Sequence, residues 1–275
     1  MIRLSFIPAS LAIFAILGFN NAQPVPHHYT TSVTDTCKWD VVLDASSFRN
    51  YSSFEAKWNY LYPWGNDHNG SAKMIAGQSE HDYVSLKKKV LRIKAQYITT
   101  EEGNSSKNPH LKIKYFSGAI YAKHQVVVSD TWTQYEISGS FKAPIAKGTW
   151  PAFWLTSTKG WPPESDILEF KGDDVNWHNT FITPANVNTT KVTIKDAATA
   201  WHHYKALLKK VNETDIDIYY YVDHKLSSVH RGNFMNKPLW IIINLQMEGS
   251  SGAPGPTTET NYYIKDILVK RSSPC

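Results

Sequence analysis

Trp150-Pro-Ala-Phe-Trp154, a short loop, and then Trp161-Pro-Pro-Glu164-Ser165-Asp166-Ile167-Leu168-Glu169-Phe170 make up the stretch that decides the fold. It has the apolar and aromatic composition of β-strands, yet its second half carries three carboxylates within six positions. Acidic residues are depleted from strands, and burying them costs free energy unless they are paired or used. The three acids therefore indicate a functional site.

The spacing of the acids places them on one face of the strand. Glu164 and Asp166 share a face because side chains alternate along a strand, whereas Glu169 would point the other way in a regular strand. A single bulge at Ile167-Leu168 brings Glu169 back to the same side. Ile167 and Phe170 then pack into the interior, and we expect the three carboxylates to line an open face.

A pair of carboxyl groups on one face is what a glycosidase needs. One ionised carboxylate attacks the anomeric carbon and one protonated carboxyl protonates the leaving oxygen, about 5 Å apart when configuration is retained. The alternative is an acidic edge strand that faces solvent. The flanking aromatic residues favour a substrate cleft over a bare surface.

Both segments closely resemble glycoside hydrolase family 16, whose bulged catalytic strand reads Glu-x-Asp-x-x-Glu. Roughly residues 37 to 275 are covered, because other parts of the chain also look like strands of the family: Tyr115 to Tyr121, Tyr135 to Pro144, Trp201 to Tyr204, Ile218 to Asp223 and Pro238 to Leu245.

The resemblance implies a role for each acidic residue. Glu164 would be the nucleophile, Glu169 the acid/base, and Asp166 the residue between them that helps to separate their pKa values. Ser165 departs from the family, which usually has an aliphatic residue there, and this change is expected to affect packing more than chemistry.

The rest of the chain also reads as all-β. After removal of a leader about 250 residues remain, which suits one large sandwich domain. Gly, Pro, Asn and Asp separate short β-branched and aromatic runs, and evidence for helices is scarce. We predict a two-sheet antiparallel β-sandwich, a jelly roll with a concave substrate cleft. The runs are Val84 to Leu86, Val90 to Ala95, Gly118 to Ala122, Thr133 to Phe141, Val192 to Ile194, Tyr204 to Leu208 and Trp240 to Leu245.

Ten tryptophans and fifteen tyrosines supply candidate sugar-binding surfaces, because flat C–H faces of sugars stack on aromatic rings. Trp154 and Trp161 are stronger candidates than Trp150, and for each of them an ordinary core position is the alternative. His178 would contact the substrate or Glu169, or else face solvent in a turn. The predicted substrate contacts are completed by two polar residues that alternate on one apolar strand, Asn244 and Gln246.

The N-terminus predicts secretion. Residues 1–22 have a basic start, an apolar stretch shorter than a bilayer span and a small residue at the end, so we predict a signal peptide and no membrane anchor. Residues 23–36 would be a disordered lead, and residues 37–275 the catalytic domain. Five sequons agree with a eukaryotic secretory route, at Asn50, Asn69, Asn104, Asn188 and Asn212.

The two cysteines, Cys37 and Cys275, stand near the ends of the mature chain. In an oxidising compartment they can form a disulfide. This requires the strand at Trp39 to Leu43 to lie beside the strand at Tyr262 to Val269. The alternatives are free thiols or a bond to another chain.

The net charge and the histidine pairs limit which ligands and metal ions the protein is expected to bind. The net charge of +5 permits attraction to acidic glycans, but a secreted chain is a poor candidate for nucleic-acid binding. His27-His28 and His202-His203 lack a third ligand for zinc. A structural calcium ion occurs in the family, but no Asp-rich loop indicates one here. We therefore expect no cofactor, no metal and a monomer.

The sequence thus predicts a secreted, retaining endo-β-glycanase that hydrolyses β-1,3 or mixed β-1,3/1,4 linkages of a glucan. The alternatives are an endo-β-1,3-galactanase, a cell-wall transglycosylase that uses the same residues, and a non-catalytic lectin on the same fold. The complete set of three acids argues against the lectin.

Overall fold

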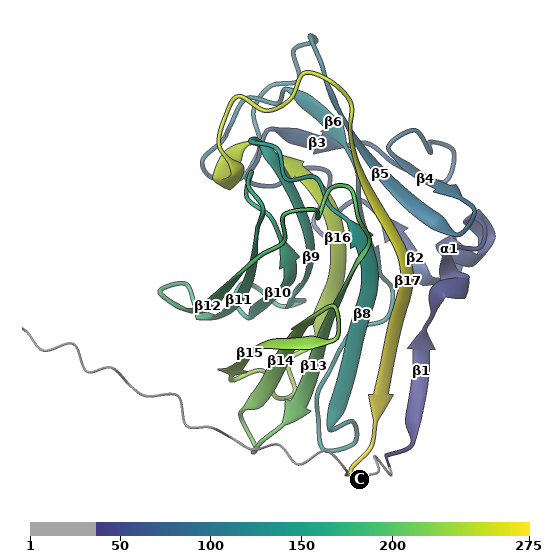
Figure 1. Cartoon of the computed structure of the whole chain (residues 1–275), viewed down its shortest axis with the longest axis vertical. Coiled ribbons are helices and arrows are strands. Elements are labelled where there is room, and N and C mark those ends of the chain that lie inside the picture. The colour runs from purple at the N-terminus through teal and green to yellow at the C-terminus, as the bar shows by residue number, and fades with distance from the viewer. Residues whose placement is uncertain (1–36) are drawn as a thin grey trace, which may run out of the picture. The chain divides into compact units, whose positions relative to one another are not determined.

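Two β-sheets pack face to face in residues 37–275, the part of the chain that the computed structural model describes (Figure 1). The prediction of an all-β, two-sheet sandwich is confirmed. The predicted signal peptide, 1–22, and the predicted lead, 23–36, lie outside the described residues.

One sheet has ten strands, which run in the order β15-β14-β13-β8-β17-β5-β6-β3, with β1 paired to β17 and β4 to β5. All of its pairs are antiparallel except β3 with β6. Its strands are β1 (Trp39–Leu43), β3 (Ala72–Met74), β4 (Val84–Lys87), β5 (Val90–Tyr97), β6 (Tyr115–Ser117), β8 (Gln134–Lys142), β13 (His202–Lys210), β14 (Ile216–Val222), β15 (Lys225–Gly232) and β17 (Thr260–Ser272).

The other sheet has seven antiparallel strands in the order β12-β11-β10-β9-β16-β7-β2. It contains the acidic strand, β10, between β9 and β11. Its strands are β2 (Trp58–Tyr60), β7 (Ala119–Ala122), β9 (Thr149–Ser157), β10 (Glu164–Glu169), β11 (Val175–Thr183), β12 (Asn186–Thr193) and β16 (Leu239–Met247).

Alternation along the strands fills the space between the sheets. Phe153 of β9 and Phe141 of β8 are fully buried and their ring centroids lie 4.9 Å apart. Tyr204 and Tyr262 pack around Phe141 from neighbouring strands of the same sheet. This aromatic layer supports β9, and through β9 it supports the acidic strand.

Three short helical segments were not predicted: η1 (Ala45–Phe48), α1 (Tyr51–Lys57) and η2 (Gly249–Ser251). Asn50 caps α1, because its side chain accepts a hydrogen bond of 2.8 Å from the backbone N–H of Ser53. Phe54 is the buried residue that anchors this helix. Seven residues are too few to show a clear helical period in the sequence.

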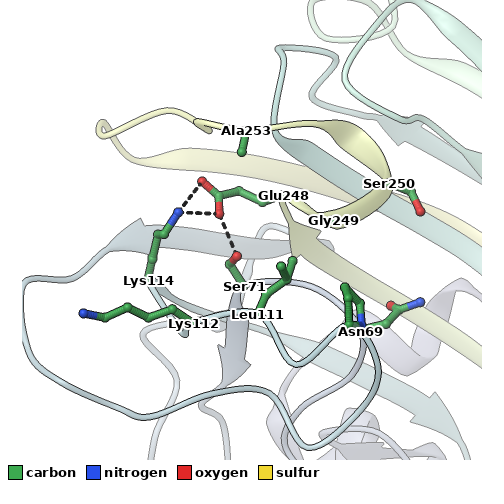
Figure 2. A pocket seen from close by; sticks show the side chains of 10 residues that line it. Asn69, Ser71, Leu111, Lys112, Lys114, Glu248, Gly249, Ser250 and Ala253 are labelled. Carbon is green, nitrogen blue, oxygen red and sulfur yellow. Dashed lines mark hydrogen bonds and ion pairs between the residues drawn. The ribbon is translucent and has the colours of Figure 1, made fainter.

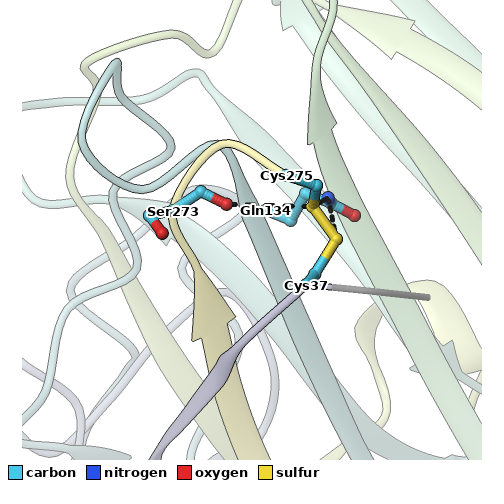
Figure 3. Close-up of a disulfide and its surroundings, with 4 residues drawn as sticks. All are labelled: Cys37, Gln134, Ser273 and Cys275. Atoms are coloured by element: carbon cyan, nitrogen blue, oxygen red, sulfur yellow. Dashed lines mark hydrogen bonds between the residues drawn. A yellow bond between two sulfur atoms is a disulfide. The ribbon is translucent and has the colours of Figure 1, made fainter.

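The two ends of the described chain meet. β1 pairs with β17 in a register that places Trp39 opposite Ser272 and Leu43 opposite Val269. Cys37 and Cys275 form a disulfide with their Cα atoms 4.9 Å apart (Figure 3). The predicted disulfide and the predicted neighbouring strands are confirmed.

Candidate active site

The three acids lie on one face of the seven-stranded sheet. In the pairing of β10 with β9, Glu164, Asp166 and Glu169 stand opposite Thr156, Trp154 and Ala152, which are spaced two apart and so share a face. The register shifts between Asp166 and Leu168, so the predicted bulge is present. Its residues are fully buried: Ile167 and Leu168.

Two tryptophans hold the outer acids. The indole N–H of Trp161 donates to Glu164 at 2.9 Å, and that of Trp150 donates to Glu169 at 2.7 Å. Trp161 is 50% exposed, so its ring is also available to a substrate. The aromatic residues that flank the acidic strand therefore position its carboxylates as well as offering a surface to sugar.

Asn179 on the next strand, β11, joins the central acid to one of the outer acids. Its amide donates to Asp166 at 2.9 Å and to Glu169 at 2.8 Å, and its own carbonyl accepts from Thr189 at 2.8 Å. The ammonium group of Lys171 forms an ion pair with Glu169 at 3.1 Å. Asp166 and Glu169 are only 4% and 7% exposed, so these donors meet them in a largely dehydrated site.

Burial sets the proton affinity of the acids. It raises the pKa of Glu164 to about 8, helped by the nearby charge of Glu169, while Trp161 and Lys171 act in the opposite direction. Burial, followed by the charges of both glutamates, raises the pKa of Asp166 well above its usual value. Glu164 and Asp166 therefore hold a proton more tightly than exposed carboxyls do.

A polar layer lies behind the acidic strand, between the sheets. Ser165 is fully buried, and its hydroxyl is 2.6 Å from the hydroxyl of Tyr220, which is 2.7 Å from that of Thr180. Tyr220 also donates to the backbone carbonyl of Asn179 at 3.1 Å. Ser165 thus does more than loosen the packing at this position, because its hydroxyl ties the acidic strand to the opposite sheet.

His178 belongs to this inner layer, and the prediction that it contacts the substrate is wrong. Its ring is fully buried and stacks on Tyr220 with centroids 4.7 Å apart. Burial lowers the pKa of His178 to about 4, although hydrogen bonds with the backbone at Asp166 and Ile167 act to raise it. Adjacent side chains of a strand point to opposite faces, so His178 faces the core while Asn179 faces the acids. A neutral imidazole therefore contacts the bulge from the core side.

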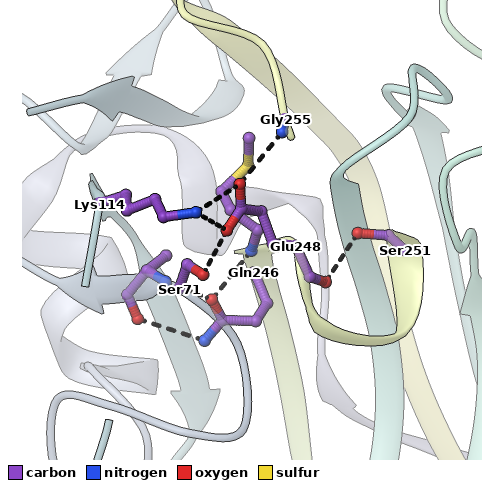
Figure 4. A network of polar contacts seen from close by, with 8 residues as sticks. Ser71, Lys114, Gln246, Glu248, Ser251 and Gly255 are labelled. Atoms are coloured by element: carbon purple, nitrogen blue, oxygen red, sulfur yellow. Dashed lines mark hydrogen bonds and ion pairs between the residues drawn. The ribbon is translucent and has the colours of Figure 1, made fainter. Parts of the chain in front are cut away.

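The contacts of Gln246 and Asn244 with substrate stay predictions, and both side chains are buried. Gln246 is 2% exposed, and its amide oxygen accepts from the backbone N–H groups of Ala72 and Met247 at 2.7 and 2.9 Å (Figure 4). Asn244 is 4% exposed and accepts from the indole of Trp154 at 2.7 Å. Trp154 itself is 6% exposed, so both residues mainly shape the floor beside Asp166.

Sequence reasoning did not assign roles to several residues at this face. Trp64 is 40% exposed, and its ring lies edge-on to Trp154 with centroids 6.1 Å apart. His68 stacks against Trp154 at the same distance. These two residues come from a loop far away in the sequence, which gives no signal of its position. Asn179 could have been found, since it alternates with Trp177 on the strand after the acidic one.

The five predicted sequons differ in environment. Asn50, Asn104, Asn188 and Asn212 are exposed, whereas Asn69 is half-buried. Glycosylation at all five stays a prediction. Within residues 37–275 no helix is long and apolar enough to cross a membrane, and no cluster of His, Cys, Asp and Glu could hold a metal ion.

A β-sandwich that presents three carboxyl groups on one face, beside exposed tryptophans, has the arrangement that cleavage of a glycosidic bond requires. The chain belongs to glycosyl hydrolases family 16, whose model matches residues 80–265. It is an endo-acting glycoside hydrolase with a β-linked polysaccharide substrate, not a lectin.

Three proteins with known descriptions are similar to this chain in sequence or in fold. The chain is 43% identical, over 84% of its own length and 90% of the relative's, to a galactan endo-beta-1,3-galactanase of Flammulina velutipes. It is 32% identical to the endo-1,3-1,4-beta-glycanase ExsH of Rhizobium meliloti over 47% of this chain and 28% of that one. The fold matches an endo-1,3-beta-glucanase from Streptomyces sioyaensis with a TM-score of 0.65 at 19% identity, covering 86% and 97% of the two chains. These findings favour the galactan alternative over the expected glucan.

Proposed function

We propose that this protein is a secreted, retaining endo-β-1,3-galactanase. The observation that carries the galactan assignment is the 43% identity, over 84% of the chain, to a protein described as an endo-β-1,3-galactanase. The second similar protein, described as an endo-1,3-1,4-beta-glycanase, matches only 47% of the chain. Secretion rests on the N-terminal sequence, and the monomer stays a prediction.

The proposed reaction is a double displacement. Glu169 protonates the glycosidic oxygen while Glu164 attacks the anomeric carbon, which forms a glycosyl-enzyme. Glu169 then removes a proton from water, and the water releases the sugar with its configuration retained. Asn179 holds Glu169 and Asp166 in place through both steps.

The proposed reaction requires Glu164 to be ionised when it attacks and Glu169 to carry the proton. The negative charge of Glu169 is one of the two causes that raise the pKa of Glu164. A proton on Glu169 removes that charge, and Glu164 keeps the hydrogen bond from Trp161. Protonation of Glu169, which the leaving group needs, thus also favours the ionised form of Glu164.

The test is a substrate panel scored for new reducing ends: linear β-1,3-galactan, laminarin, lichenan and xyloglucan. We expect β-1,3-galactan to give the highest kcat/KM, with oligosaccharides of several lengths released early. Laminarin or lichenan as the best substrate would contradict the galactan assignment. Products longer than the starting oligosaccharide, at the expense of hydrolysis, would support the transglycosylase instead.

A further inference from the structure

A cavity lies beside the candidate active site. Its volume is about 430 Å³, and it lies between the loop that precedes β6 and the segment around η2 (Figure 2). Its lining combines apolar and polar side chains, among them Leu111, Ala253, Asn69, Lys114 and Glu248. This volume is within the range of cavities that hold small ligands.

Trp150 connects this cavity to the catalytic carboxyls. The indole N–H of Trp150 donates to Glu169, and a Cβ atom added to Gly249 in the cavity wall would lie 2.9 Å from the ring of Trp150. In the pairing of β9 with β16, Trp150 stands opposite Gln246, two residues before Glu248. Glu248 follows Met247, the last residue of β16, so the cavity begins where the pairing with β9 ends.

The cavity is displaced along the strand direction from the row of paired residues that crosses the sheet at Asp166, through Trp154, Ile242 and Tyr121. Glu248 and Gly249 of its wall follow Met247, the last residue of β16, so the cavity lies beyond the end of that strand. A polysaccharide backbone that crosses the strands at Asp166 would reach the cavity only through a group that projects from it.

Glu248 is held in an unfavourable backbone conformation at the wall of this cavity. Its φ is 54° and its ψ is −141°, a region that costs about 1–3 kcal/mol for a residue other than glycine. Its carboxylate accepts from Ser71 Oγ at 2.7 Å, from Lys114 Nζ at 2.9 Å and from the N–H of Gly255 at 3.2 Å (Figure 4). Burial raises the pKa of Glu248, but these hydrogen bonds outweigh it and the pKa lies below its usual value.

Two groups in the cavity wall have unused hydrogen-bonding capacity. Lys114 is 37% exposed, and its ammonium has three donors, so donor capacity remains after the contact with Glu248. The side-chain oxygen of Asn69 is buried without a hydrogen-bond partner. The hydroxyls of a sugar can accept from Lys114 and donate to Asn69, whereas an anion cannot donate.

The charge of the cavity also favours an uncharged ligand. Glu248 neutralises Lys114, and Glu101 forms an ion pair with Lys112 at 2.6 Å. Leu111 and Ala253 supply apolar surface for the C–H face of a sugar ring.

We propose that this cavity is a side subsite for an uncharged hexosyl branch on the polysaccharide backbone. Lys114 and Asn69 would bind the hydroxyls of the branch, and Glu248 would position Lys114. The proposal rests on the proposed function only in requiring an endo-acting enzyme with a β-linked backbone.

The test compares linear β-1,3-galactan with the same backbone carrying single hexosyl branches. The protein is made in a host without N-glycosylation, because Asn69 also begins a sequon. Ala253→Trp fills the cavity from an exposed position. We expect the ratio of kcat/KM for the branched over the linear substrate to fall at least tenfold in Ala253→Trp and Asn69→Ala, and to stay within twofold in the control Ala198→Trp, which changes an exposed residue of a distant turn.

Binding is measured separately in a Glu164→Gln background, where the Kd for a branched oligosaccharide should rise at least tenfold on adding Ala253→Trp. An unchanged ratio and an unchanged Kd would overturn the proposal, and tighter binding of a uronic-acid branch than of a hexosyl branch would overturn the uncharged class. If the enzyme cleaves glucan rather than galactan, the galactan assignment fails. The same comparison is then made with linear and branched β-1,3-glucan, so the side subsite is tested independently of the galactan assignment.

Discussion

Glu164→Gln is expected to stabilise the fold at alkaline pH, although it removes the proposed nucleophile. Burial and the charge of Glu169 raise the pKa of Glu164 from 4.5 to about 8. A carboxyl whose pKa is higher in the folded state contributes stability that is fully present below the unfolded pKa. That contribution is lost as the pH rises through the folded pKa. Gln, which cannot ionise, avoids this loss.

The size of the effect follows from the shift. One pKa unit corresponds to about 1.4 kcal/mol, so the full shift of Glu164 would be worth about 5 kcal/mol. Glu164 is only half-buried by accessible surface, so solvent screening reduces this figure, and we expect about 2 kcal/mol. For a domain of this size, that is a rise in Tm of roughly 4–8 °C.

The assay is thermal unfolding of the wild type and Glu164→Gln, at about pH 4 and about pH 9, on either side of the interval in which the contribution is lost. The two proteins should have similar Tm values at the lower pH, and the variant should melt higher at the upper pH. Glu213→Gln is the matched control, because its side chain is 83% exposed. An equal or lower Tm for Glu164→Gln at the upper pH would refute the electrostatic reasoning.

Three further outcomes are expected. Glu169→Ala should lose most activity on polysaccharide but much less on an activated aryl glycoside, and added azide should restore turnover to a β-glycosyl azide; recovery of the α-azide would exchange the roles of Glu164 and Glu169. Cys275→Ser should lower the Tm without changing the cleavage products, because the disulfide closes a loop of 238 residues that the chain-entropy model credits with about 5 kcal/mol; two titratable thiols in the native wild type would argue against the bond. Tyr220→Phe should cost about 1–3 kcal/mol and lower kcat more than it changes KM, because it leaves the buried hydroxyl of Ser165 without its partner. Tyr97→Phe, at a 38% exposed position, is the control for this change, and equal effects in both variants would remove the case for the inner polar layer.

The sequence by itself determined the features that depend on local periodicity. Alternation placed Glu164 and Asp166 on one face, and the offset of Glu169 required the bulge that β10 contains. The bond between Cys37 and Cys275 was also predictable, because two cysteines leave few possibilities. The helix α1 was missed because seven residues do not show a period.

Only the tertiary structure decided which partners meet the acids and which faces are buried. Asn179 reaches Asp166 and Glu169 because β11 pairs with β10, and Trp64 reaches Trp154 through a loop of no regular pattern. His178 and Gln246 had the composition of binding residues, but the opposite sheet and the segment at Ala72 cover them. The physical reason is that a strand's period fixes two faces without saying what packs against each. That choice depends on contacts between residues more than a hundred positions apart, such as Gln246 with Ala72.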